Sequence, residues 1–135
     1  MRKPMPEPTP VSAPFWEGLA QRRIRIQYSP SSDEYVFYPR TLAPRTLADD
    51  LVWREISGEG TLYTYTVARR PTAPFWSDRV PQLLAVVQWD EGPRVTTELT
   101  NVDPEGIRIG MRVRPVFQSD PESGMTLLWY EPADA

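Results

Sequence analysis

The chain has 135 residues, contains neither histidine nor cysteine, and carries a net charge of −3 at neutral pH. These facts exclude Ser-His-Asp and Cys-His catalysis, thiol redox chemistry, disulfides and any Cys/His zinc site. The acidic balance also disfavours bulk binding of nucleic acid, which needs a clustered positive field. The composition therefore favours a binding or accessory protein over an enzyme that works alone.

The length fits one domain that can bury a core through packing alone. The sequence contains no run of about 18 apolar residues, which a transmembrane helix would need. Its basic start is not followed by an apolar signal core. We therefore expect a soluble, cytoplasmic protein that does not contact a membrane.

The first 50 residues divide into three segments. Residues 1–14 hold five of the sixteen prolines and predict a flexible or extended arm. Residues 15–27 begin with an apolar helical face and then alternate from Ile24, which predicts a short helix followed by the start of a strand. Residues 28–50 are irregular, with a short β-ribbon over residues 35–38.

Residues 51–135 are rich in strand patterns separated by turns. Residues 60–70 alternate between the two faces of a strand, and residues 83–90 form the nearly continuous apolar run of a central strand. Gly110 marks a bulge or bend in the strand pattern of residues 107–118. About five strands with regular turn signals predict a small closed barrel, with the OB-fold as the first choice.

The order of these features resembles the DUF35 OB-fold proteins. The resemblance is carried by FWEGL at 15–19, YPR at 38–40, the W-x-E-x-S-G-x-G-T-L-Y pattern that starts at Trp53, and LLWYEPA at 127–133. It implies a mainly β fold with an N-terminal helix, a rubredoxin-like ribbon over residues 28–50 and a five-stranded OB-fold barrel over residues 51–135.

The sequence departs from this family at the metal site. Members usually carry two Cys-x-x-Cys pairs beside the YPR segment, and aligned on that segment this chain has Ser29, Ser32, Ala43 and Thr46 there. None of these is a plausible zinc ligand, since such a ribbon needs four soft or borderline donors. We expect a degenerate, metal-free ribbon, and we expect it to be the least stable and most partner-dependent part of the fold.

The resemblance also implies a function. Similar proteins support partners in acyl-CoA metabolism, so the chain is expected to be a non-catalytic accessory subunit of a thiolase-like enzyme of the lipid-transfer-protein type, a thiolase or aldolase. It would act in a hetero-oligomer on acyl-CoA or a related thioester and help to form the substrate cavity. Two alternatives stay open: a partner of a MaoC-type enoyl-CoA hydratase, or a single-strand nucleic-acid-binding OB-fold. The acidic charge and the single lysine count against the last.

Candidate ligand residues lie in one loop and in the YPR segment. Arginine can chelate the phosphates of coenzyme A and an aromatic ring can stack on its adenine; the alternative interpretation is that the loop aromatics close one end of the barrel. Arg40 could instead form an ordinary salt bridge. The candidates are Arg40, Arg69, Arg70, Phe75, Trp76 and Arg79.

A second set of candidates lies on the predicted helix. Phe15, Trp16 and Leu19 share one face, and a helix this short is unstable without packing. The face therefore either packs on its own barrel or contacts a partner, where tryptophan is a frequent anchor. Acidic pairs such as Asp49–Asp50 and Asp90–Glu91 lie in predicted turns, and we assign no catalytic residue among them.

Overall fold

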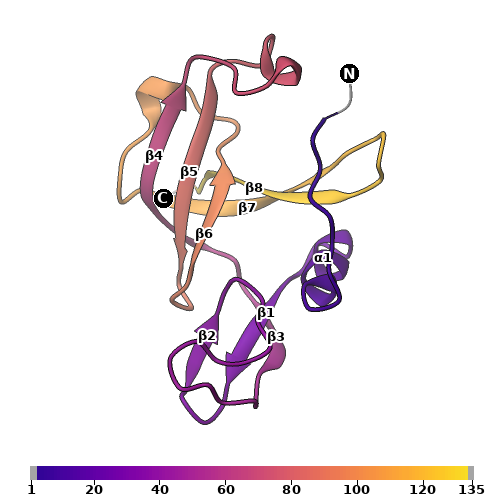
Figure 1. Cartoon of the computed structure of the whole chain (residues 1–135). Helices are drawn as coiled ribbons and strands as arrows, with labels where there is room; N and C mark the ends of the chain where they lie inside the picture. The colour runs from indigo at the N-terminus through magenta and orange to yellow at the C-terminus, as the bar shows by residue number, and fades with distance from the viewer. Residues whose placement is uncertain (1–2, 134–135) are drawn as a thin grey trace.

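Two antiparallel β-sheets and one α-helix make up the protein, which the computed structural model describes over residues 3–133 (Figure 1). The smaller sheet has the order β2-β1-β3 and the larger one has the order β6-β5-β4-β7-β8. The elements are α1 (Ala13–Ala20), β1 (Ile24–Ser29), β2 (Glu34–Val36), β3 (Val52–Ile56), β4 (Gly60–Ala68), the 3-10 helix η1 (Pro74–Trp76), β5 (Gln82–Trp89), β6 (Arg94–Glu98), the 3-10 helix η2 (Pro104–Gly106), β7 (Arg112–Ser119) and β8 (Thr126–Pro132).

The larger sheet curls so that its two edge strands meet. Just after β6, Leu99 forms a parallel bridge with Tyr130 of β8, and the Thr100 N–H donates to the Tyr130 carbonyl at 2.8 Å. The Thr97 hydroxyl on β6 adds a 2.8 Å bond to the carbonyl of Leu128. These contacts close the five strands into the predicted small barrel, and the mainly β fold with one N-terminal helix is confirmed.

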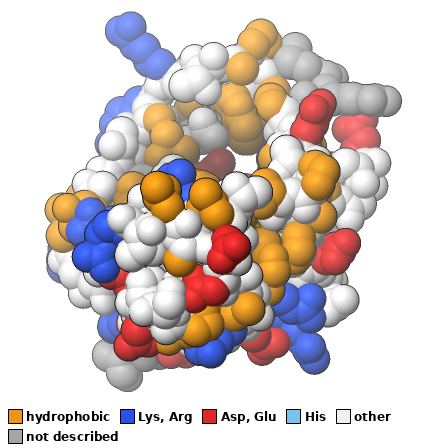
Figure 2. Space-filling model, turned by 60° about the horizontal axis from the view of Figure 1, so that its bottom comes forward, with side chains coloured by type: hydrophobic (Ala, Val, Ile, Leu, Met, Phe, Trp, Pro, Cys, Tyr) orange, Lys and Arg blue, Asp and Glu red, His pale blue; other side chains and the backbone are white. Residues whose placement is uncertain are grey.

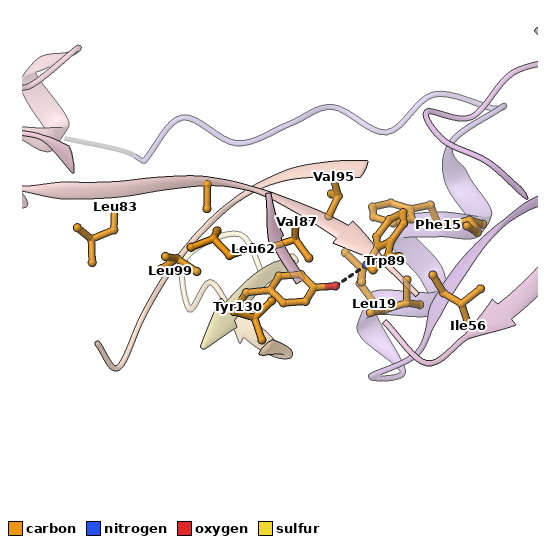
Figure 3. Close-up of a cluster of buried hydrophobic side chains, with 14 of the residues drawn as sticks. Phe15, Leu19, Ile56, Leu62, Leu83, Val87, Trp89, Val95, Leu99 and Tyr130 are labelled. Atoms are coloured by element: carbon orange, nitrogen blue, oxygen red, sulfur yellow. Dashed lines mark hydrogen bonds between the residues drawn. The ribbon is translucent and has the colours of Figure 1, made fainter. Parts of the chain in front are cut away.

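The core of the barrel contains a hydrogen-bonded aromatic pair. Trp89 and Tyr130 are the largest fully buried side chains. The Trp89 indole N–H donates to the Tyr130 hydroxyl at 2.5 Å (Figure 3). That hydroxyl in turn donates to the Gly58 carbonyl at 2.6 Å. Burial raises the pKa of Tyr130 well above its ordinary value. The neutral phenol therefore persists as a bridge between β5, β8 and the segment before β4.

The smaller sheet, which we call the ribbon, is built around β1. Its register pairs Ile24 with Ile56 and directs both toward the core, together with Ile26. The sequence places residues 51–56 with the OB-fold domain, whereas β3 pairs with β1 and continues into β4 through Gly58. The ribbon and the barrel are therefore joined by a shared stretch of chain, residues 52–60.

The helix α1 begins at Ala13, two residues before the predicted start. Pro14 accounts for the difference, since proline fits the first turn of a helix, where its missing N–H leaves no bond unmade. Residues 3–12 precede the helix and run beside the barrel (Figure 1). None of the helices in the described part of the chain combines the length and apolar character needed to cross a membrane.

Candidate functional site

A groove of about 600 Å³ lies between the N-terminal segment, α1 and the barrel strands β6 and β8. Seen from the ribbon side, the surface is hollowed and hydrophobic side chains border the hollow (Figure 2). Its volume lies within the range typical of small-molecule sites. Apolar side chains dominate the lining: Phe15, Trp16, Leu19, Phe37, Tyr38, Leu84, Val95, Leu127, Leu128 and Trp129.

Several polar groups of the groove are bonded within the chain. Thr97 donates to the Leu128 carbonyl, and the Tyr38 hydroxyl donates to Thr96 at 3.4 Å. The Gln82 amide donates to the Glu98 carboxylate at 3.1 Å. Burial raises the pKa of Glu98, and the bond from Gln82 and the charge of Lys3 only partly oppose this. The groove therefore presents few free donors or acceptors to a ligand.

The loop between β4 and β5 brings three of the predicted ligand residues together. Phe75 and Trp76 on η1 meet edge to face with ring centroids 4.8 Å apart, and the Arg79 guanidinium lies 4.5 Å from the Phe75 centroid. Trp76 and Arg79 line a recess of about 300 Å³ that shares Glu98 and Trp129 with the groove. Both rings are half-buried, so they do not seal the barrel end as core plugs would.

Sequence reasoning missed Lys3, which lies in the same recess. Its Nζ is 5.9 Å from the Trp76 ring centroid and 5.1 Å from that of Trp129. Both distances fall within the reach of a cation–π interaction. The signal available in the sequence is that Lys3 is the only lysine of the chain.

The remaining predicted arginines stand apart. Arg69 and Arg70 are exposed at the end of β4 and form no ion pair with any residue of the described range 3–133. Arg40 lies on the ribbon, where its backbone N–H and C=O each bond the buried Gln27 side chain at 2.7 Å. The ribbon, which carries Arg40, and the loop between β4 and β5 lie at opposite ends of the molecule (Figure 1), so Arg40 and the η1 residues cannot bind one small ligand together.

The predicted partner contacts on α1 require a correction. Phe15 is 6% exposed and Leu19 is fully buried, because both pack into the core of this chain. Phe15 meets Phe37 of the ribbon at 5.2 Å, and Phe37 meets Trp89 of the barrel at 5.0 Å. Only Trp16, which is half-buried in the groove, stays available to a partner or a ligand.

Serine and aspartate side chains occupy the region of the family's metal site. The Ser29 hydroxyl, fully buried, donates to Asp50 Oδ1 at 2.8 Å, and the Ser31 N–H donates to Asp50 Oδ2 at 2.8 Å. Ala43 is buried, and Thr46 accepts a bond from the Ala48 N–H. Within residues 3–133 no three His, Cys, Asp or Glu side chains gather around one point. The residues present therefore do not fit a zinc ion.

The ribbon and its loops expose large hydrophobic side chains. Tyr38, Leu42, Leu47 and Val52 are all exposed, and we call these four residues the ribbon patch. Leu47 is the most exposed of them, at 70%. Val52 lies on β3 and the other three lie in the segment between β2 and β3, so all four belong to the ribbon part of the chain.

The chain is similar to known proteins over most of its length. Residues 53–118 match the family described as the C-terminal OB-fold domain of ChsH2. The chain is 31% identical over 130 residues to a DUF35 domain-containing scaffold protein of Pyrococcus furiosus, and the match covers 94% of each chain.

Two further relatives bear names of enzyme complexes. A probable enoyl-CoA hydratase alpha subunit of Thermomonospora curvata is 34% identical over 121 residues, but this chain spans only 37% of its length. Among solved structures, the chain resembles one from the Ltp2-ChsH2(DUF35) aldolase with a TM-score of 0.84 and 30% identity, covering 96% of this chain and 100% of that one.

Proposed function

Because this chain belongs to the DUF35 family of OB-fold proteins, we propose that it is a non-catalytic accessory subunit of a thiolase-like enzyme. The observation that carries the proposal is the likeness of the whole chain to a component of the Ltp2-ChsH2(DUF35) aldolase. The partner would act on acyl-CoA or a related acyl thioester, and this chain would bind it and complete its substrate cavity.

The chemistry of the side chains supports a non-catalytic role. The sequence has no histidine or cysteine to serve as base or nucleophile. Asp50 and Asp90 are committed to hydrogen bonds with Ser29, Ser31 and Arg112, which fits structural use of these carboxylates. The reacting groups would therefore come from the partner enzyme.

The ribbon patch is the surface that best fits the partner. Its apolar side chains are exposed in the isolated chain, and burial in an interface would remove them from water. The absence of metal ligands at the same place fits a ribbon that is stabilised by its partner. We expect no zinc in the complex from this subunit.

Co-expression with a thiolase-like enzyme from the same organism tests the proposal. The chain alone is expected to be inactive, whereas the co-purified complex cleaves or transfers acyl groups of acyl-CoA substrates faster than the enzyme alone. A chain that forms no complex with such an enzyme, or that leaves its rate on acyl thioesters unchanged, would overturn the proposal.

A matched pair of surface variants tests the ribbon patch. Leu47→Glu places a charge in the patch and is expected to weaken the complex at least tenfold, since interface anchors commonly contribute about 2 kcal/mol. Ile109→Glu is the control, because Ile109 is similarly exposed, at 67%, but lies in the barrel half of the chain. Titration calorimetry measures the affinity of both variants for the partner enzyme. Equal affinities would show that the ribbon patch is not part of the interface.

The similarity to a hydratase alpha subunit favours one second candidate, a partner of a MaoC-type enoyl-CoA hydratase. The two functions differ in the reaction of the complex. Hydration removes the conjugated double bond of an enoyl thioester, whereas thiolysis or aldol cleavage breaks a carbon–carbon bond. Product analysis by mass spectrometry distinguishes them.

A further inference from the structure

The N-terminal segment has the build of a stiff strap. Prolines alternate with other residues at positions 4, 6, 8 and 10, which restricts the backbone to extended conformations before folding. At its base the Thr9 N–H donates to the Ser12 hydroxyl at 2.8 Å, and the Ala13 N–H donates to the Thr9 carbonyl at 2.8 Å. Holding residues 3–12 in one direction therefore costs little conformational entropy.

The far end of this segment is fastened to the barrel. Lys3 places its ammonium group near the faces of Trp76 on η1 and Trp129 on β8, in the recess that also contains the Glu98 carboxylate. Between the two anchors, Glu7 and Thr9 line the groove. Residues 3–12 thus form a wall of the groove that is attached at both ends, and Figure 1 shows them running from the η1 side down to α1.

The interior of the groove selects for hydrocarbon. A peptide laid into it would bring backbone N–H and C=O groups, but the Thr96, Thr97 and Glu98 side chains already bond within the chain. Unpaired buried backbone groups would cost more than apolar contact returns. A saturated chain needs no hydrogen bonds and contacts the Trp16, Leu127 and Trp129 side chains directly.

Charge gives the ligand a direction. No lysine or arginine within the described range lines the groove, whereas Lys3 and Arg79 stand in the recess at one end, where the two cations outnumber the single carboxylate of Glu98. An anionic head would be attracted to that end and kept away from the acidic Glu7. The hydrocarbon chain would then run from the recess toward α1.

We propose that the groove binds the hydrocarbon chain of an anionic acyl compound, and that residues 3–12 form a strap over it, fastened by Lys3 between Trp76 and Trp129. The acyl assignment rests on the proposed function, while the geometry by itself indicates an elongated hydrocarbon with its polar end at Lys3. Opening the strap would require Lys3 to leave the two rings, and the base at Thr9 and Ser12 can act as the pivot.

A chain-length series tests the ligand. Saturated fatty acids from hexanoate to dodecanoate are titrated into the full-length chain. Binding is followed by the intrinsic tryptophan fluorescence, to which Trp16 and Trp129 of the groove contribute. Affinity is expected to rise about fourfold with each methylene, the equivalent of about 0.8 kcal/mol, until the groove is full. Affinity that does not depend on chain length would overturn the hydrocarbon site.

Two variants of the only lysine test the strap. Lys3→Met keeps the length of the side chain but removes its charge, and is expected to weaken dodecanoate binding about fivefold, whereas Lys3→Arg restores a cation and keeps the affinity within about twofold. Since Lys3 is only half-buried and does not belong to the hydrophobic core, neither variant threatens the fold. Equal affinities of the wild type and Lys3→Met for dodecanoate would overturn the role of Lys3 in fastening the strap.

The cysteine-free sequence allows a direct readout of strap opening. A Met5→Cys variant carries one thiol in the strap, and its rate of reaction with a thiol reagent is expected to fall with bound dodecanoate and to rise when Lys3→Met is added. Unchanged rates in both comparisons would exclude a moving strap.

These experiments use the chain without its partner, so their failure leaves the accessory-subunit proposal standing. Failure of complex formation, in turn, leaves the groove result standing.

Discussion

At the residue scale, the hydroxyl of Tyr130 connects three parts of the barrel. It accepts from the Trp89 indole and donates to the Gly58 carbonyl, and all three groups are buried. Buried polar groups are costly unless bonded, so this single oxygen satisfies two partners at once. Trp89 and Tyr130 can therefore both be buried in one small core, because their polar atoms are hydrogen-bonded there.

Tyr130→Phe removes the oxygen and leaves the Trp89 N–H and the Gly58 C=O without a partner. We expect a loss of about 1–3 kcal/mol in the free energy of unfolding. Tyr65→Phe is the control, because Tyr65 is half-buried on β4 and forms no side-chain hydrogen bond within the described residues. Urea denaturation measures both; losses of equal size would contradict the bridging role.

Asp50 is the second residue on which local order depends. The bonds from Ser31 and Ser29 lower the pKa of its carboxyl group below the ordinary value of 3.8. A lowered pKa in the folded state means that the interaction stabilises the protein above that ordinary value. The contribution is lost as the pH falls through the lower, folded-state pKa.

Asp50→Asn is therefore expected to destabilise the ribbon at pH 7 and to reduce the loss of stability between pH 7 and pH 3. Asp49→Asn, which changes the exposed neighbouring carboxylate, serves as the control. Urea unfolding at the two pH values gives the comparison. The interpretation is wrong if Asp50→Asn unfolds with the same pH dependence as the wild type.

At the scale of the elements, the link between β3 and β4 decides how the ribbon meets the barrel. Gly58 adopts φ +75°, a conformation that side chains with a Cβ rarely adopt, and its carbonyl is the acceptor for Tyr130. A Cβ at this position would lie 2.1 Å from Cδ1 of Ile24, which is itself buried in the core. Both the backbone and the space therefore require glycine here.

Gly58→Ala and Gly124→Ala form a matched pair, since Gly124 has φ +74° but no atom within 4 Å of an added Cβ. Gly124→Ala is expected to cost about 1–2 kcal/mol from backbone strain alone. Gly58→Ala should cost about 1–3 kcal/mol more, because overpacking adds to the same strain. Thermal and urea unfolding test the difference, and equal costs would show that Ile24 moves aside freely.

At the scale of the whole molecule, a row of aromatic rings unites the helix, the ribbon and the barrel. Phe37 follows β2 and meets Phe15 of α1 on one side and Trp89 of β5 on the other. The hydrophobic core accordingly includes residues from all three parts. The parts are therefore expected to unfold together.

Phe37→Ala should weaken the packing of the ribbon against the helix and the barrel. We expect a loss of about 2–4 kcal/mol in the free energy of unfolding. We also expect faster hydrogen exchange of β1 amides than of β5 amides, because the ribbon loses the Phe37 contact whereas the barrel keeps its backbone hydrogen bonds between strands. Phe75→Ala is the control. Phe75 is also half-buried, but the one aromatic ring that it meets among the described residues is its neighbour Trp76 on η1. Equal acceleration in β1 and β5 would contradict the role of Phe37 in holding the ribbon to the barrel.

Much of the fold could be predicted because its signals are local. Strand alternation and turns indicated a barrel. The ribbon was recognisable from its motifs, and the sequence has Ser29, Ser32, Ala43 and Thr46 where the family usually has zinc-binding cysteines. The aromatic and cationic loop with Phe75, Trp76 and Arg79 was also visible as one cluster, because its residues are close in the chain.

By itself, the sequence determined which chemistry is absent, which segments form strands, and which family the chain resembles, because composition, periodicity and motif order are written in consecutive residues. Only the tertiary structure decided which side chains meet. It paired β3 with β1, buried Phe15 and Leu19, separated Arg40 from the η1 loop, and brought Lys3 to Trp76 and Trp129. These contacts join residues far apart in the chain, and their free energy depends on the packing of the complete core rather than on local preference.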